Sequence, residues 1–106
     1  NVARTSPSLS LEDVVELICR SFDLTPAQLS SKSRRQNLVL ARNTAFFLLR
    51  KHTDLTLEQI GERFNRKHST VIKGITAVER EMSRHSALGG QIEHTVSMIE
   101  RSAMLV

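Results

Sequence analysis

The chain has 106 residues, of which 40% are hydrophobic, and it carries 15 Lys and Arg against 11 Asp and Glu, a net charge of +4. This length suits one small domain and excludes a second folding unit of ordinary size. The single cysteine, Cys19, excludes an intramolecular disulfide and a Cys-rich zinc site. No apolar run reaches the ~18 residues that cross a bilayer, and no signal-peptide pattern opens the chain. We therefore expect a cytoplasmic protein.

Positive charge is concentrated in the middle of the chain. Residues 32–84 hold twelve Lys and Arg against five Asp and Glu, a net +7. Residues 1–31 hold two Lys and Arg against four Asp and Glu, and residues 85–106 hold one Arg against two Glu. A polyanion is the natural partner of such a segment.

The first part of the chain predicts a linker followed by two helices. Residues 1–10 have a linker-like composition, so we expect one domain over residues 11–106 that belongs to a longer protein. Ser10 and Asp13 have the spacing of a capping box, which predicts a helix from residue 11. Its apolar face consists of Leu11, Val14, Val15, Ile18 and Phe22. Thr25, Pro26 and Gln28 then suit the start of a very short helix.

The next part predicts a basic loop and two helices. Residues 30–35 lack apolar side chains and should form the loop, which a helix over residues 37–52 follows. Thr56 and Gln59 repeat the capping-box spacing and predict a short helix that ends near Phe64. In the helix over residues 37–52, Arg42 and Arg50 lie outside the predicted buried stripe, which consists of Leu38, Ala41, Ala45, Leu48 and Leu49.

The last part predicts two more helices that are separated by a glycine break. Gly89 and Gly90 interrupt the apolar pattern. The helix before them, over residues 68–84, should bury Val71, Ile72, Ile75, Val78 and Met82. The helix after them should bury Ile92, Val96 and Ile99. No segment alternates strictly over the length of a strand, so the expected fold class is all-α.

The helices over residues 56–64 and 68–84 have the spacing of a helix-turn-helix, because only three polar residues separate them. Such a short turn makes the N-terminus of the second helix protrude enough to enter a major groove. Lys73, further along that helix, either touches phosphate or faces water. Five residues at the protruding end can hydrogen-bond to base edges or phosphates: Arg66, Lys67, His68, Ser69 and Thr70.

The same region resembles a known family. The run LTLEQIGERFNRKHSTVIKGI, preceded by SSKSRRQNLVLARNTAFFLLRKHT, is similar to the C-terminal DNA-binding domain of the bacterial DnaA replication initiators. The upstream run DVVELICRSFDLTPAQLSSKSR resembles the opening of that domain, so the similarity spans about residues 11–84. Its most specific parts are the basic loop before a helix with Ala-Arg, the Ile60-Gly61 step and the HSTV tetrapeptide. We therefore expect a Trp-repressor-like helix-turn-helix bundle.

The resemblance implies sequence-specific binding to a short duplex element, the DnaA box of a replication origin, through both grooves. Arg34 would enter the minor groove, where the concentrated negative potential favours Arg, with Lys32 and Arg35 beside it. His68, Ser69 and Thr70 would face bases and phosphates in the major groove. The contacts to the DNA backbone would fall on Arg42, Asn43, Arg50, Leu57 and Glu58.

Three departures from the family pattern bear on which DNA sequence the domain prefers. The turn is one residue shorter than the usual Gly-Gly-Arg-Asp, and Ala41 stands where Pro is frequent. Lys67 replaces the acidic residue that usually precedes the His. A carboxylate accepts from cytosine N4 and an ammonium cannot, so Lys67 should favour guanine or a phosphate.

Two other functions are consistent with much of this sequence pattern. One is a DnaA-like module attached to a transposase or a regulator, and the other is a helical module that binds an acidic protein. Membrane binding is disfavoured, because Glu12, Asp13 and Glu16 make the first amphipathic helix acidic.

Enzymatic activity and cofactors are not expected. The chain has no Gly-rich phosphate loop, no acidic cluster for a two-metal site and no recognisable Ser-His-Asp arrangement. His52, His85 and His94 lack the spacing of metal ligands. The ATPase activity associated with the initiator family would belong to a separate domain of the parent protein.

Overall fold

Six helices and no strand make up residues 9–104, the part of the chain that the computed structural model describes. They are α1 (Leu11–Phe22), α2 (Pro26–Leu29), α3 (Gln36–His52), α4 (Leu57–Arg63), α5 (His68–Ser83) and α6 (Ala87–Met104). The expected all-α class and the predicted basic loop before α3 are confirmed. Residues 1–8 of the expected linker lie outside the described residues, while Leu9 is 5% exposed and joins the core.

The starts of the first five helices fall into two classes. α1 and α4 begin with the predicted capping boxes at Ser10 and Thr56, in which side chains three residues apart bond to backbone N–H groups. At α2 the predicted N-cap residue Thr25 also forms such a box, with Gln28. α3 and α5 begin at the N-cap residues Arg35 and Lys67, which make no side-chain cap hydrogen bond. The N–H groups in the first turns of α3 and α5 are therefore not satisfied by a cap.

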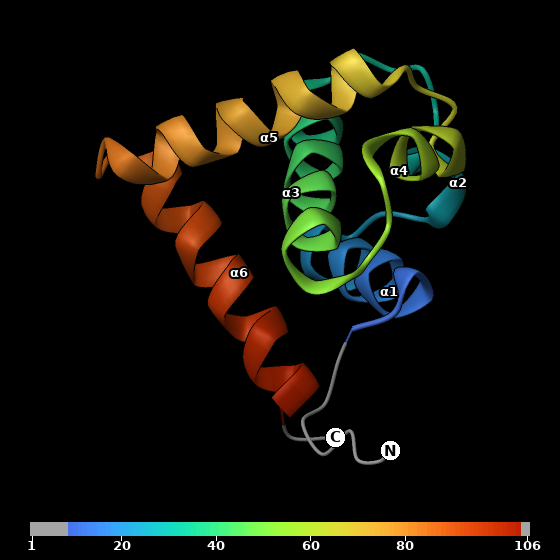
Figure 1. Cartoon of the computed structure of the whole chain (residues 1–106). Coiled ribbons are helices and arrows are strands. Elements are labelled where there is room, and N and C mark those ends of the chain that lie inside the picture. Colours follow the sequence, from blue (N-terminus) through green and yellow to red (C-terminus); the bar gives the residue numbers. More distant parts are fainter. Residues whose placement is uncertain (1–8, 105–106) are drawn as a thin grey trace.

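α3 runs through the centre of the molecule. In Figure 1, α5 crosses over its N-terminal end and α6 returns from the far end of α5 towards α1. Phe46 of α3 meets Phe64 edge to face, with ring centroids 5.3 Å apart, at the junction of α3 with the helix-turn-helix. The predicted stripe of α3 is buried, and this packing fixes the helix-turn-helix on α3.

The turn between α4 and α5 is closed by a contact between Gly61 and Arg66. Asn65 has a φ of 57°, a left-handed conformation that Asn tolerates, and the N–H of Arg66 donates to the carbonyl oxygen of Gly61 at 2.7 Å. A β-carbon at residue 61 would collide with the carbonyl oxygen of Arg66. Glycine at this position therefore permits the close turn.

The prediction that Ile72 is buried in α5 is wrong, because its side chain is 43% exposed. The buried line of α5 is formed by Val71, Gly74 and Val78. Gly74 lets α5 approach α3, since a β-carbon there would collide with the side chain of Asn43. Ile72 follows Val71 by one residue and is turned away from this line by about 100°.

The prediction that Gly89 and Gly90 break the helical pattern is also wrong, because both lie within α6. The break falls earlier, at His85, which has a φ of 54°, and Ser86 Oγ accepts from the N–H of Gly89 at 2.9 Å. A β-carbon on Gly89 would collide with the carbonyl oxygen of Glu81 in α5. Gly89 therefore serves close packing of two helices, which composition alone cannot distinguish from a helix break.

Candidate nucleic-acid interface

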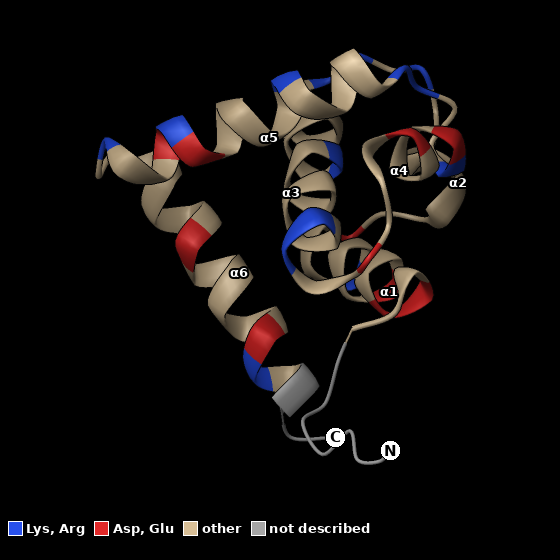
Figure 2. Cartoon of the chain, in the orientation of Figure 1, with Lys and Arg blue, Asp and Glu red and all other residues tan. Residues whose placement is uncertain are grey.

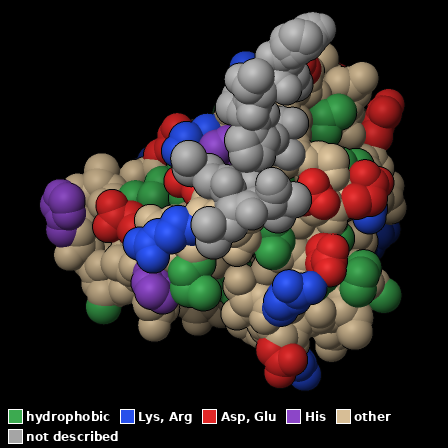
Figure 3. Space-filling model, turned by 90° about the horizontal axis from the view of Figure 1, so that it is seen from below, with side chains coloured by type: hydrophobic (Ala, Val, Ile, Leu, Met, Phe, Trp, Pro, Cys, Tyr) green, Lys and Arg blue, Asp and Glu red, His purple; other side chains and the backbone are tan. Residues whose placement is uncertain are grey.

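Positive side chains gather where the basic loop meets the turn of the helix-turn-helix. In Figure 2 the loop before α3 and the start of α5 carry blue segments at the same corner of the molecule. Lys32, Arg34 and Arg35 of the loop are exposed, as is Lys67 at the start of α5. The face that Figure 3 shows, seen from below, carries acidic side chains interspersed with Lys and Arg.

The N-terminus of α5 is open to an anionic ligand. His68, Ser69 and Thr70 are all exposed. The first turn contains no acidic residue, and its N–H groups have no side-chain cap. Exposed N–H groups and the positive end of the helix dipole attract phosphate, and the three side chains add donors and acceptors.

Arg42 is buried, contrary to the expectation that it lies outside the buried stripe. The residue is 6% exposed, and its Nε donates to the carbonyl oxygen of Leu29 at 2.9 Å. One terminal nitrogen donates to the carbonyl oxygens of Ser31 and Ser33 at 3.0 and 3.2 Å. Burial lowers the pKa of the Arg42 guanidinium, and the nearby charge of Arg66 lowers it further. The carbonyl groups offset the cost of burying this charge, so Arg42 holds the basic loop.

Arg66 connects the turn of the helix-turn-helix to the same loop. Its Nη2 donates to the carbonyl oxygen of Ser31 at 2.6 Å, and its Nη1 donates to that of Phe64 at 2.9 Å. The Ser31 carbonyl oxygen therefore accepts from two arginines, one on α3 and one in the turn.

A hollow separates the basic loop from the N-terminus of α5. Four cationic residues contribute to its lining, which makes it suitable for an anion such as phosphate. Ser33 and Asn65 also line it, although the sequence marked neither as a contact. In the sequence, Ser33 stands between Lys32 and Arg34, and Asn65 directly precedes Arg66. The full lining is Lys32, Ser33, Arg34, Arg42, Asn65, Arg66 and Thr70.

The remaining predicted contacts lie away from this hollow. Asn43 is half-buried where α3 crosses α5, and Lys73 is exposed further along α5. Arg50 is exposed near the other end of α3, about 21 Å along the helix axis from its first residue. Leu57 is half-buried against the core, and Glu58 is an exposed carboxylate in the first turn of α4.

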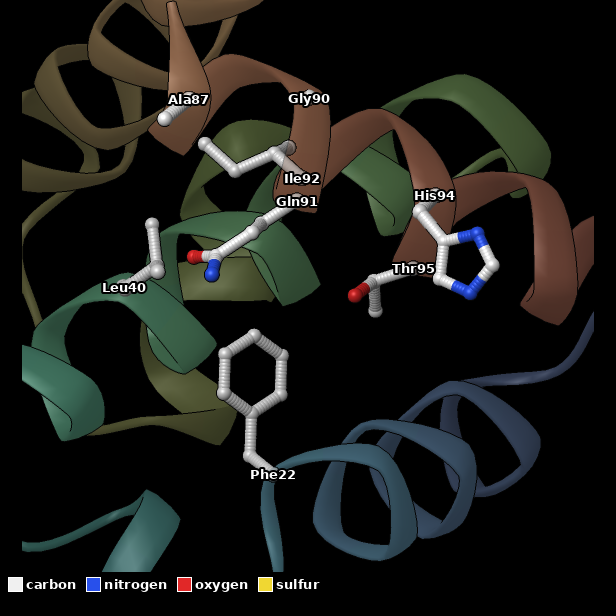
Figure 4. Close-up of a pocket in the computed structure, with 8 residues that line it drawn as sticks. All are labelled: Phe22, Leu40, Ala87, Gly90, Gln91, Ile92, His94 and Thr95. Carbon is white, nitrogen blue, oxygen red and sulfur yellow. The ribbon is translucent and has the colours of Figure 1, made fainter.

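A separate apolar cleft lies between α6 and the helices α1 and α3. Figure 4 shows Phe22 and Leu40 on one side and Ile92 with the rest of the α6 segment on the other. No Lys or Arg lines this cleft, so it does not extend the basic surface.

Among residues 9–104, no three or more His, Cys, Asp or Glu side chains lie close enough together to hold a metal ion. His85 and His94 are exposed, and His52 lies 2.7 Å from a carboxylate oxygen of Glu100.

Burial raises the pKa of the Cys19 thiol despite the opposing charge of Arg63. None of the helices in the described part is long and apolar enough to cross a membrane.

Comparison with known proteins identifies the family. The family described as "Bacterial dnaA protein helix-turn-helix" matches residues 11–78. The "Chromosomal replication initiator protein DnaA" of Oleidesulfovibrio alaskensis is 55% identical over 104 residues, which cover 98% of this chain and 23% of the relative. The proteins of the same name from Desulfatibacillum aliphaticivorans and Porphyromonas gingivalis are each 34% identical, over 77% and 86% of this chain and 18% and 20% of the relatives. The chain thus spans roughly a fifth of the length of these relatives, and it belongs to the bacterial DnaA helix-turn-helix family.

Proposed function

We propose that this domain binds double-stranded DNA sequence-specifically, at DnaA-box-like sites of a replication origin. The N-terminus of α5 would enter the major groove and the basic loop would enter the adjacent minor groove. The observation that carries the proposal is that Arg34 of the exposed loop and Thr70 at the open end of α5 line one cationic hollow. The name shared by the relatives supports the origin as the location of these sites.

Direct readout falls to different residues in the two grooves. Arg34 reads the minor groove, flanked by Lys32 and Arg35, because a narrow minor groove attracts the guanidinium. The hydroxyl groups and imidazole of Ser69, Thr70 and His68 reach base edges or phosphates in the major groove.

The remaining contacts position the domain on the DNA backbone. Lys67 and Lys73 are exposed ammonium groups that neutralise phosphates, and Lys67 can also donate to guanine. Arg50 and the N-terminus of α4 would reach the flanking backbone. At α4 the contact to phosphate would come from backbone N–H groups around Leu57. The side chain of Glu58 cannot make it, because a carboxylate repels phosphate.

The domain would act as a non-catalytic reader within a longer cytoplasmic protein that carries a separate ATPase domain. The greater length of the relatives supports the presence of other domains in the parent protein. An ATP hydrolysis assay on this chain alone tests the reader role, which predicts no turnover above buffer.

Selection of bound sites from a random duplex pool tests the function directly. We expect enrichment of one short asymmetric element, with DnaA-box-like character. Recovery of unenriched sequences would contradict sequence-specific readout. An acidic polypeptide added as competitor distinguishes the alternative of a protein-binding module, because it should displace the selected duplex only weakly.

A further inference from the structure

We propose that Arg42 and Arg66 are positioning residues that fix the distance between the minor-groove loop and the recognition helix α5. Together with Ser31 they form what we call the spacer. This inference rests on the proposed function, because the two elements that the spacer joins are those assigned to the two grooves.

The spacer joins three elements through one acceptor. The Ser31 carbonyl oxygen accepts from Arg42 of α3 at 3.0 Å and from Arg66 of the turn at 2.6 Å. Arg42 also holds Ser33 in the loop, and Arg66 also holds the carbonyl oxygen of Phe64 at the end of α4. The loop and the recognition helix are therefore both tied to Ser31.

The rest of the loop offers little else to set its position. Its hydrogen bonds from the N–H of Ser33 to Ser31 Oγ and from the N–H of Arg35 to Ser33 Oγ link residues only two apart, and the Ser31 hydroxyl and N–H donate to the carbonyl oxygen of Gln28 in α2. They shape the loop without tying it to the helix-turn-helix. Because residues 30–35 have no apolar side chain, packing cannot replace the spacer. A planar guanidinium bonds to several carbonyl groups in a fixed geometry, which an ammonium cannot reproduce.

The position of the spacer predicts what it controls. The hollow between the loop and α5 separates Lys32 and Arg34 from Thr70. A duplex read in both grooves must pass the intervening backbone strand through this hollow. The spacer therefore sets how many base pairs can lie between the part of the site that the loop reads and the part that α5 reads.

A series of duplexes tests this control. The parent duplex carries the selected site, and the others have one base pair inserted or deleted between its two parts. For the wild-type chain we expect each change to weaken binding about tenfold or more, the cost of a lost base contact. For Arg66→Met the penalty should fall to about threefold or less, because the loop no longer holds a fixed register.

A double-mutant cycle gives an independent readout. Arg34→Ala should weaken binding about tenfold in the wild-type chain but only about twofold in Arg66→Met, because the loop, still bonded to Arg42, is no longer tied to the turn and Arg34 loses its fixed distance from α5. Equal fold-changes in the two backgrounds would overturn the proposal. Arg20→Met removes one positive charge from α1, where the Arg20 side chain is 70% exposed, and should leave the spacing penalty unchanged.

Charge-conserving variants separate a spacer from a phosphate contact. Arg66→Lys and Arg42→Lys should keep the salt dependence of binding but show the reduced spacing penalty, with circular dichroism confirming that each variant is folded. If Arg66→Lys keeps the wild-type penalty, Arg66 is a phosphate contact and the proposal fails. If the wild-type chain shows no preference for the selected duplex, the proposed function and the spacer fail together. If that preference exists but every variant has the wild-type penalty, only the spacer fails.

Discussion

The N–H of Arg66 donates to the carbonyl oxygen of Gly61 at 2.7 Å, across the turn that orients α5. A β-carbon at residue 61 would meet the backbone of Arg66, which cannot move without opening the turn. We predict that Gly61→Ala lowers the free energy of unfolding by about 1 to 3 kcal/mol, the range for steric overpacking. Urea denaturation of the two chains measures this loss.

Gly90→Ala is the matched control for that substitution. Gly90 lies within α6, and a β-carbon there would meet no atom within 4 Å. We expect the free energy of unfolding of this variant to rise by about 0.5 to 1 kcal/mol, because Ala has a higher helix propensity than Gly. Equal stability changes at the two positions would contradict the assigned role of Gly61.

His68→Ala should reduce discrimination between sites more than general affinity for DNA. The exposed His68 lies at the end of α5 assigned to the major groove, so its loss should cost about 1 to 3 kcal/mol on the selected duplex. Binding to a random duplex should change little. Kd values on both duplexes check this prediction, and an equal loss on both would make His68 a phosphate or structural residue.

Lys32→Ala and Lys67→Ala should each weaken binding and flatten its salt dependence. Lys32 lines the hollow and Lys67 lies at the start of α5, and both side chains are exposed. Each phosphate contact contributes about 0.9 to the slope of log K against log salt. A titration across salt concentrations should show the slope fall by about one for each variant. An unchanged slope would remove that lysine from the backbone contacts.

Glu100 should make the docking of α6 on α3 sensitive to acid. Burial raises the pKa of its carboxyl group, but hydrogen bonds and charges from Lys51 and His52 outweigh burial, so the pKa lies below 4.5. Because the folded state favours the ionised form, this stabilisation is present above about pH 4.5 and is lost as pH falls through the folded-state pKa.

Glu100→Gln should therefore cost about 0.5 to 1 kcal/mol near neutral pH and reduce the loss of stability below pH 4.5. Urea denaturation over a pH series measures both effects. The exposed Glu93 on the same helix provides the control Glu93→Gln, which should retain the wild-type pH dependence.

Local patterns were sufficient to predict most of the fold. The capping boxes at Ser10, Thr25 and Thr56 depend on residues three apart, and the turn at Asn65 depends on one residue that tolerates a left-handed backbone. Such features are encoded in neighbouring positions, so one sequence reveals them. Gly89 was misread because its role depends on Glu81 of another helix.

The candidate site was less predictable, because its organisation depends on contacts between distant residues. Helical periodicity predicts Arg42 outside the buried stripe, but its guanidinium donates to carbonyl groups 9 to 13 residues earlier, on Leu29 of α2 and on Ser31 and Ser33 of the loop. The bond from Arg66 to Ser31 spans 35 residues and leaves no local pattern. The prediction that the exposed residues Arg34 and His68 contact DNA rests on charge, the helix-turn-helix spacing and the family resemblance.

The central claim is that this domain reads base sequence in duplex DNA. The most direct measurement is the ratio of Kd values for a DnaA-box duplex and for a shuffled duplex of the same composition, at physiological salt. We predict that the DnaA-box duplex binds about 10³-fold or more tightly, the lower end of the range for specific DNA-binding proteins. Equal affinities for the two duplexes would contradict the claim.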